Sequence, residues 1–251
     1  MKKTHSISFF KEVEEEFLKL KDDKEAKSLS RFFKTGPGQY GEGDKFLGIK
    51  VPVTRNIVSR YKDSVNIDTA IRLAESEWHE IRLAGFLFLI ELFNKYRKGK
   101  DLYSMKKIVD TYISLLSRGN NWDLVDLVAP KILGIWISEH PEDEKVLFAL
   151  ADKSASLWHQ RVAIVSTLEL IRIRKFDITL KIARKFLTHK HDLIHKATGW
   201  MLREMGKRGG MEELKVFIEE NIDIMPRTML RYSIEKFEEP LRIYYLRLRR
   251  D

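Results

Sequence analysis

Apolar residues recur along the chain at intervals of three and four positions. This spacing places apolar side chains on one face of an α-helix, whereas a half-buried strand requires alternation with a period of two, and no stretch alternates convincingly in that way. The pattern predicts helices over 9–20, 71–95, 104–116, 122–138, 157–172, 178–187, 193–205, 211–221 and 227–237. Because the connections are short, consecutive helices are expected to lie antiparallel and in contact. The sequence therefore predicts an all-α fold.

Four of these segments share a basic residue shortly before a small one, followed by an apolar stripe. They are WHEIRLAGFLFL (78–89), LWHQRVAIVSTL (157–168), DLIHKATGWML (192–202) and PRTMLRYSIEKF (226–237). The small residues Ala84, Ala163, Ala197 and Ser233 are separated by 79, 34 and 36 residues, so the first gap spans two repeats. This period is typical of solenoids built from HEAT-like antiparallel helix pairs, in which one helix of each pair lines a concave surface. We expect one such domain over 1–251, with a flexible glycine-rich connector around 35–45 and a basic tail at 242–251.

Composition excludes several classes of protein. The chain has 251 residues and 43% apolar content, enough for an ordinary core, but its densest apolar run, LAGFLFLIELF at 83–93, is about half a membrane span in length. The absence of cysteine excludes disulfides, thiolate metal sites and cysteine nucleophiles. The seven histidines show no HExxH or comparable metal spacing, so we expect no metal and no cofactor. These features fit a cytoplasmic monomer with no membrane contact.

Charge is distributed unevenly along the chain. The formal net charge is +9, and residues 151–251 hold 21 Lys and Arg against 14 Asp and Glu, which accounts for +7 of it. Basic clusters there include RIRK at 172–175, KRG at 207–209 and the tail RIYYLRLRR at 242–250. This asymmetry favours a polyanionic partner, most often nucleic acid, over the alternative of a solvated basic surface without a partner.

The stretch RGNNWDLVD at 118–126 carries the first candidate site. If a helix begins at Trp122 after an Asn121 cap, its apolar stripe comprises Leu124, Val125, Val128 and Ile132. Trp122 and Asp126 are one turn apart on the same face, roughly 130° from the centre of that stripe. Asp123 in the first turn complements the helix dipole, whereas Asp126 has no such structural role, and Pro130 breaks or kinks the helix one turn later.

Equivalent helices add further candidates to this pair. Arg161 in LWHQRVA and Trp200 in HKATGWMLRE lie on successive repeats, so that a groove would bring them together with Trp122 and Asp126. Each has a plainer alternative, since Trp200 also suits a core position and Arg161 also suits a bridge between neighbouring helices. Four basic residues lie on or beside the Trp200 helix, namely Lys196, Arg203, Lys207 and Arg208. They are expected either to contact phosphate groups or to form a solvated face without a partner.

The segments NNWDLVD, WHQRVA and IHKATGWMLRE, together with GPGQYGEGDKFLGIKVP at 36–52, resemble the bacterial AlkD-type DNA alkylation-repair glycosylases over residues 30 to 240. The resemblance implies a HEAT-like solenoid whose basic concave face cradles duplex DNA and excises N3- and N7-alkylated purines without a base-flipping pocket. It implies lesion-site roles for Trp122, Asp126, Arg161 and Trp200, and places the family's N-terminal aromatic contact at Tyr40. The interval from Tyr40 to FLGI is slightly shorter than in the family pattern.

The chemistry of such lesions fits these residue types. Alkylation at N3 or N7 makes the purine cationic and hence an activated leaving group, so a general acid is largely unnecessary. A carboxylate such as Asp126 would stabilise the cationic sugar that forms as the glycosidic bond breaks and would orient the attacking water. The indoles of Trp122 and Trp200 present electron-rich faces to a cation. Arg161 would hold a phosphate near the damaged nucleotide.

Two other readings remain open at the level of sequence. A HEAT-like scaffold or a structure-specific DNA binder would not cut anything, and Asp126 discriminates against it because a carboxylate facing DNA repels phosphate. An RNA-binding helical repeat would require a ladder of stacking aromatics, which the repeats lack. The glycines at 36, 38, 41 and 43 do not form a nucleotide-binding loop, because no Gly-Lys-Ser/Thr follows them.

Overall fold

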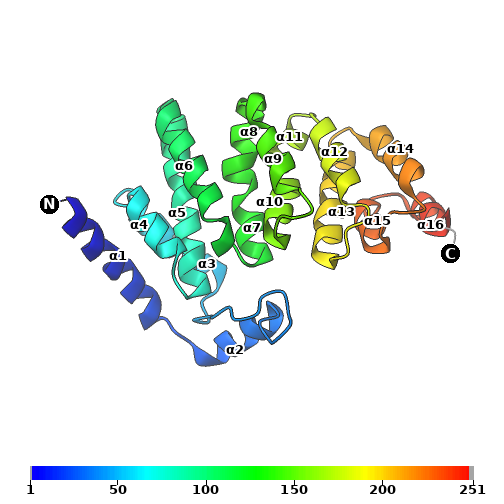
Figure 1. Ribbon diagram of the computed structural model, residues 1–251. Helices are drawn as coiled ribbons and strands as arrows, with labels where there is room; N and C mark the ends of the chain where they lie inside the picture. Colours follow the sequence, from blue (N-terminus) through cyan, green and yellow to red (C-terminus); the bar gives the residue numbers. More distant parts are fainter. Residues whose placement is uncertain (1, 249–251) are drawn as a thin grey trace. The chain divides into compact units, whose positions relative to one another are not determined.

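The computed structural model describes residues 2–248, and the fold is all-α and solenoid-like, as predicted (Figure 1). Extended pairing within this range is limited to one bridge between Lys45 and Trp78. Among the described residues no helix is both long and apolar enough to cross a lipid bilayer. The helices group into two compact units, residues 1–124 and 125–251, which are described separately.

The first unit is built around α5. Its helices are α1 (Lys2–Lys19), α2 (Asp23–Phe32), α3 (Val51–Tyr61), α4 (Ile67–Ala74), α5 (His79–Lys98) and α6 (Leu102–Ser114), followed by the 3₁₀ turn η1 (Leu116–Arg118). The helix α5 packs against α3, α4 and α6 (Figure 1). Because neighbours surround it, α5 is buried at every position from His79 to Ile90. A helix that is apolar on most of its circumference is expected at the centre of a helical layer.

The second unit places α10 and α13 at its centre. Its helices are α8 (Ile135–Glu139), α9 (Lys145–Leu150), α10 (Leu157–Ser166), α11 (Leu168–Arg172), α12 (Asp177–Lys185), α13 (Asp192–Lys207), α14 (Met211–Asn221), α15 (Arg227–Ser233) and α16 (Glu239–Leu248), with the π-helical turn η2 (Pro130–Gly134) and the 3₁₀ turn η3 (Pro141–Asp143). The helix α10 packs against η2, α9 and α13, and α13 packs against α14 and α15. The division between the units falls within α7 (Trp122–Val128).

The predicted helices are mostly present, but some boundaries were wrong. The segment 71–95 forms two helices, because the chain breaks at 75–78, where the Trp78 amide donates to the Ser76 hydroxyl at 3.2 Å and Trp78 bridges to Lys45. The segment 122–138 changes to a π-helical turn at Pro130, which cannot continue the α-helical hydrogen bonds. The helices α2, α3, α9 and α16 were not predicted. Most of the expected basic tail is helical in α16, and residues 249–251 of it lie outside the described residues.

The small residues of the repeat lie where helices approach closely. Ala84, Ala163 and Ala197 are 0% exposed and Ser233 is 1% exposed. Glycines beside two of them permit the approach, because a Cβ on Gly85 would lie 2.2 Å from the Ala74 backbone nitrogen of α4. A Cβ on Gly199 would likewise lie 2.6 Å from the Met229 carbonyl oxygen of α15. Close contacts between helices therefore explain the small residues of the repeat.

A buried group of four charged side chains lies at the start of α5, and we call it the α5 ionic cluster. It consists of Asp44, His79, Arg82 and Asp123, all at most 7% exposed. The two ring nitrogens of His79 lie 2.8 Å from Asp44 Oδ2 and 2.9 Å from Asp123 Oδ2. Since both partners are carboxylates that only accept, both nitrogens of His79 must donate, and the ring is an imidazolium. Arg82 also pairs with Asp44, so two positive and two negative charges balance.

Glu80, the next residue of α5, binds the end of the glycine-rich segment. Its carboxylate accepts three backbone N–H bonds, from Leu47 at 2.9 Å, Gly48 at 2.9 Å and Ile49 at 3.0 Å. Gly48 has φ +90° and a Cβ there would lie 2.3 Å from the Asp22 carbonyl oxygen, so only glycine fits. The connection that precedes α3 is thus held to α5 by a buried anion. This arrangement explains Asp44 and Glu80 structurally, without a substrate.

The close approach of α4 and α5 predicts a large effect of one methyl group. Gly85→Ala should lower the free energy of unfolding by about 1–3 kcal/mol, because the Ala74 backbone has to move and this outweighs the gain in helix propensity. Gly99→Ala is the matched control, since its Cβ would meet nothing closer than 3.5 Å. Urea denaturation followed by circular dichroism measures both. Equal stability of the two variants would contradict the packing described.

The α5 ionic cluster predicts a loss of stability at alkaline pH. Burial by itself lowers the pKa of His79, but the carboxylates of Asp123 and Asp44 outweigh it and raise the pKa from 6.5 to about 9. The imidazolium therefore contributes fully below pH 6.5, and its contribution is lost as pH rises through about 9. The loss should be on the order of 2–3 kcal/mol.

The control for this titration is His79→Gln, which retains a side chain able to hydrogen bond but cannot titrate. It should be less stable than the wild type at pH 7 and should lose less of its remaining stability between pH 7 and pH 10, as measured by denaturant unfolding. Parallel pH dependences of the two proteins would exclude a charged His79.

Candidate functional site

The helix α7 presents two side chains away from the core, as the sequence predicts. It begins at Trp122, whose amide donates to the Asn121 side chain at 3.0 Å. Its apolar stripe is buried, with Leu124, Val125 and Val128 at most 2% exposed. Trp122 and Asp126 are only partly buried and lie one turn apart on the same face of the helix. The face that carries this pair is therefore accessible.

In the second unit, Asp126 is held by Arg161 of α10. Arg161 Nε donates to Asp126 Oδ1 at 2.9 Å and Arg161 Nη2 donates to Asp126 Oδ2 at 2.7 Å. Two parallel bonds between a planar guanidinium and a carboxylate define both the position and the orientation of the carboxylate. The side chain of Arg161 is 6% exposed and that of Asp126 is 17% exposed. The Asp126 side chain thus remains partly accessible to solvent.

The start of α13 holds the other side of the guanidinium. Arg161 Nη1 donates to the Leu193 carbonyl oxygen at 2.5 Å. Trp200 follows Leu193 by seven residues on α13, which is two turns, so the two residues share a face of the helix. Trp200 is partly buried. In the second unit, Asp126 and Arg161 are thus in direct contact, whereas Trp200 lies two turns beyond the Leu193 contact on α13.

The first unit surrounds Trp122 with aromatic rings. Phe33 stacks on Trp122 with ring centroids 5.3 Å apart, and it also packs against Phe46 at 5.1 Å and the His79 imidazolium at 5.2 Å. Phe46 also stacks on His79 at 4.3 Å. A cation against aromatic faces is favourable. The α5 ionic cluster therefore supports the ring stack behind Trp122.

The sequence interpretation missed Phe32. Its ring lies against Trp122 with centroids 5.8 Å apart at 71°, and the residue is 61% exposed. A large apolar side chain so exposed at the end of α2, beside a partly exposed indole, is a feature of a contact surface. Tyr40, the aromatic predicted at this end of the molecule, is partly buried. The pair Phe32–Phe33 in the sequence was the available signal, because two adjacent rings on a helix point to different sides.

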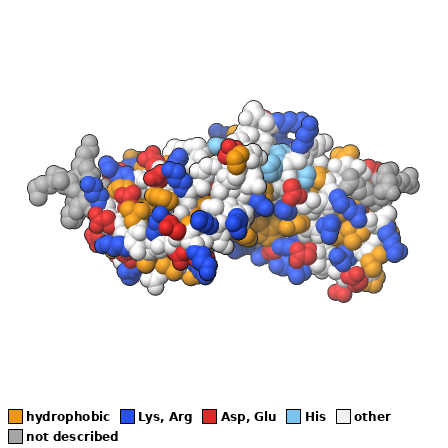
Figure 2. Space-filling model, turned by 90° about the horizontal axis from the view of Figure 1, so that it is seen from below, with side chains coloured by type: hydrophobic (Ala, Val, Ile, Leu, Met, Phe, Trp, Pro, Cys, Tyr) orange, Lys and Arg blue, Asp and Glu red, His pale blue; other side chains and the backbone are white. Residues whose placement is uncertain are grey.

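The basic residues predicted to bind phosphate are engaged by carboxylates. Lys196 pairs with Asp192 at 2.7 Å, Arg203 pairs with Glu235, and Lys207 and Arg208 both pair with Glu204. Figure 2 shows blue Lys and Arg side chains interspersed with red Asp and Glu on the visible face. Only the Lys196–Asp192 pair is exposed on both sides, since Glu204 is buried and Arg203 is largely covered. The role of the basic residues as phosphate contacts stays a prediction.

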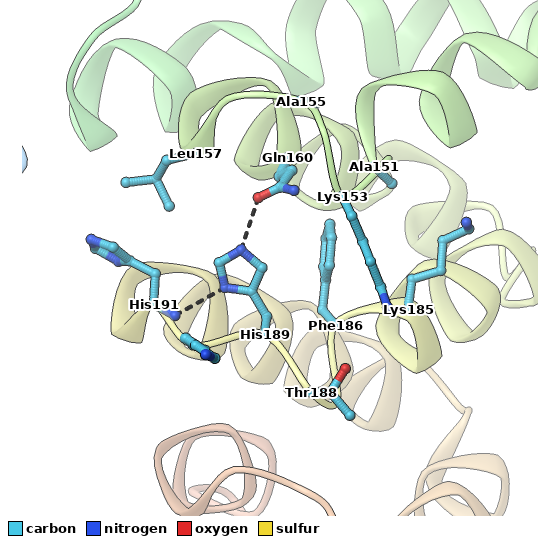
Figure 3. A pocket seen from close by; sticks show the side chains of 11 residues that line it. Ala151, Lys153, Ala155, Leu157, Gln160, Lys185, Phe186, Thr188, His189 and His191 are labelled. Carbon is cyan, nitrogen blue, oxygen red and sulfur yellow. Dashed lines mark hydrogen bonds between the residues drawn. The ribbon is translucent and has the colours of Figure 1, made fainter.

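A pocket of about 500 Å³ lies between the start of α10 and the connection from α12 to α13 (Figure 3). Its polar lining comprises Lys153, Gln160, Lys185, Thr188, His189, Lys190 and His191. No carboxylate is among the lining residues, so the pocket is electropositive. Among the described residues there is no group of three or more side chains arranged to hold a metal ion.

Comparisons with known proteins bear on the fold and the family of the chain. A solved structure of a predicted DNA alkylation repair enzyme from Enterococcus faecalis superimposes with a TM-score of 0.68 at 18% identity, covering 87% of this chain and 97% of that chain. At this identity the likeness establishes the fold alone. A comparison with curated proteins gave no match. The family model for DNA alkylation repair enzymes matches residues 13–237, and the chain belongs to the DNA alkylation repair enzyme family.

Proposed function

We propose that the protein is an AlkD-type DNA N-glycosylase, which hydrolyses the glycosidic bond of cationic N3- and N7-alkylated purines in duplex DNA. The observation that carries this proposal is the partly exposed carboxylate of Asp126, oriented by two hydrogen bonds from Arg161. Family membership supports a role in the repair of alkylated DNA. The carboxylate supplies the chemistry that such a repair reaction needs.

The reaction requires an anion more than an acid. When the bond between the sugar C1′ and the purine nitrogen breaks, both electrons go to the purine, whose positive charge is thereby cancelled. Positive charge develops on the deoxyribose, and Asp126 stabilises it electrostatically. Water then attacks C1′ and loses a proton, for which the same carboxylate is an acceptor. The products are the free alkylated base and an abasic sugar.

Accessibility distinguishes Asp126 from the other arginine-bound aspartate. Asp44 is also paired with an arginine, Arg82, but its side chain is 0% exposed and both of its oxygens have partners within the α5 ionic cluster. Asp126 has a 17% exposed side chain on a helix face that also carries Trp122. A substrate can therefore approach Asp126 and cannot approach Asp44.

Arg161 is assigned here as the residue that positions Asp126. Three of its five N–H groups are engaged by Asp126 and Leu193, and the residue is 5% exposed. Its predicted contact with a phosphate would have to use the remaining two N–H groups. The resemblance to AlkD-type enzymes supports Trp122 and Trp200 as indole contacts to the cationic nucleotide, each worth about 0.5–2 kcal/mol. Phe32 extends the exposed aromatic surface next to Trp122.

One observation favours a second candidate function, a DNA binder without catalysis. The Asp126–Arg161 pair is internally neutral, so the carboxylate repels phosphate less than an isolated one would. Bidentate pairs between adjacent helices also occur as purely structural features. The two functions differ in whether a methylated base is released, and the experiment below separates them.

The first test is Asp126→Asn. Release of methylated purines from dimethyl-sulfate-treated duplex DNA should fall on the order of 100-fold or more, because the fixed anion is lost while the amide still accepts a bond from Arg161. Duplex affinity should stay equal or rise, since one negative charge is removed. Asp223→Asn, at an exposed position on the same unit, is the matched control. Wild-type release by Asp126→Asn would refute the role of the carboxylate, and no release by the wild type would favour the binder.

The second test concerns the exposed aromatic next to Trp122. Phe32→Ala should weaken excision by about 2- to 30-fold, equivalent to one aromatic contact with a cation, and leave the unfolding midpoint nearly unchanged. Tyr40→Ala tests the aromatic predicted from the sequence in the same assay. Tyr103→Ala, 82% exposed on α6, is the control for loss of an exposed ring. Unchanged excision in Phe32→Ala would remove Phe32 from the proposed site.

A further inference from the structure

The connection between α12 and α13, residues 186–191, carries two histidines, and a third, His195, follows in α13. All three are partly buried and engaged in hydrogen bonds with the chain around them. Figure 2 shows histidine side chains gathered on the visible face, and Figure 3 shows His189 hydrogen-bonded to Gln160 on one side and to the backbone of His191 on the other. The proposed glycosylase chemistry uses none of them. The hydrogen bonds of His189 and His191, however, lead through Leu193 to Arg161.

The tautomer of His189 follows from its partners. The Gln160 amide nitrogen donates to the Asp152 carbonyl at 2.8 Å, so the amide oxygen of Gln160 faces His189 Nε2, also at 2.8 Å. Nε2 must therefore carry the proton. Nδ1 of His189 then accepts the backbone N–H of His191 at 3.0 Å. Both ring nitrogens are used, and this arrangement requires the neutral ring.

His191 caps α13, and it can do so only with a neutral ring, as in His189. It is the residue before the helix, and its Nδ1 accepts the backbone N–H of Leu193 at 3.1 Å. Helices are usually capped by Ser, Thr, Asp or Asn, whose oxygens accept at any pH near neutrality. A histidine cap accepts only while Nδ1 is unprotonated. Protonation would remove the acceptor and place a positive charge at the positive end of the helix dipole.

The capped residue is the one that holds the guanidinium. Leu193 receives the cap bond through its N–H and binds Arg161 Nη1 through its carbonyl oxygen at 2.5 Å. Without the cap, the first turn of α13 frays, and the position of this carbonyl is no longer defined. Arg161 then keeps only its bonds to Asp126, and both side chains gain freedom.

We propose that neutral His191, supported by His189, is a positioning residue: it caps α13 so that the Leu193 carbonyl holds Arg161 in the orientation that presents Asp126. The inference rests on the proposed function for its consequence in catalysis. The positioning role makes excision sensitive to acid, although His191 itself does not touch the substrate. A proton on His191 loosens the Arg161–Asp126 pair.

The surroundings of His191 lower its pKa and so disfavour its protonation. The charged and titratable groups around it are Lys153, Arg161, Lys185, His189, Lys190, Asp192 and His195. Burial lowers the pKa of His191 below 6.5, and His195 and Arg161 lower it further, while Asp192 opposes them. Burial likewise lowers the pKa of His189, reinforced by His195 and His191. The cap is therefore intact at neutral pH and is lost as pH falls below 6.5.

The test compares His191→Asn, which keeps a capping oxygen but cannot titrate in this range, with His191→Ala, which has no cap. Single-turnover excision from methylated duplex DNA is measured between pH 5 and pH 8.5, with spontaneous depurination subtracted. At pH 8 the Asn variant should match the wild type within about twofold, and the Ala variant should be several-fold slower. As pH falls below 6.5 the wild type should lose activity more steeply than the Asn variant. His140→Asn, another partly buried histidine of the same unit, should follow the wild type.

Two results would overturn the proposal: an Ala variant as fast as the wild type at pH 8, or an Asn variant with the acid limb of the wild type. A measurement independent of activity is ¹⁵N NMR of the full chain labelled at Leu and Arg. The Leu193 amide and the Arg161 Nε–H resonances should shift with one common midpoint in the wild type and should not shift in His191→Asn. Independent midpoints would overturn the positioning role, whether or not the wild type releases a base. Absence of base release by the wild type would separately refute the glycosylase.

Discussion

The bidentate pair between Arg161 and Asp126 is the interaction on which the second unit and the candidate site both depend. One guanidinium joins α7 through Asp126 and α13 through the Leu193 carbonyl, while its own helix, α10, lies at the centre of the unit. Removal of either partner would leave a nearly buried charge uncompensated, which is strongly unfavourable. The orientation of the carboxylate and the packing of the helices are therefore determined by the same side chain.

The first unit contains a similar arginine–aspartate pair, which is fully buried. Arg82 precedes the small residue Ala84 by two positions, as Arg161 precedes Ala163, and each arginine pairs with an aspartate that comes earlier in the chain. In the first unit, His79 and Asp123 complete a neutral buried cluster, and Asp44 is fully enclosed. In the second unit, Asp126 keeps an exposed side. The arginine at this position of the repeat thus binds an enclosed aspartate in the first unit and a partly exposed one in the second.

Under the proposed function, the neighbours of the pair explain why few catalytic groups are needed. A cationic base is already activated, so the protein has to supply an oriented anion and a surface for the nucleotide. Orientation comes from Arg161, and the orientation of Arg161 comes in part from the cap of α13. Under the proposed positioning role of His191, the histidine segment makes this support sensitive to acid.

The sequence by itself determined the helical class, the repeat, and the face of α7 that carries Trp122 and Asp126. Those features depend on the local period of apolar residues, and a helix of known period places each side chain without further information. It also left open a bridge between helices as a role for Arg161. It could not decide between that bridge and a phosphate contact, because the partner, Asp126, is 35 residues away.

Only the tertiary structure decided the features that arise from contacts between distant segments. The break between α4 and α5 depends on Lys45, the charge of His79 depends on Asp44 and Asp123, and the aromatic contact of Phe32 depends on Trp122. The role of Asp123 shows the difference most clearly. Its position in the first turn of α7 already suited the helix dipole, yet its carboxylate binds a buried imidazolium 44 residues earlier in the chain. Periodicity describes which way a side chain points, whereas its partner depends on how the helices pack.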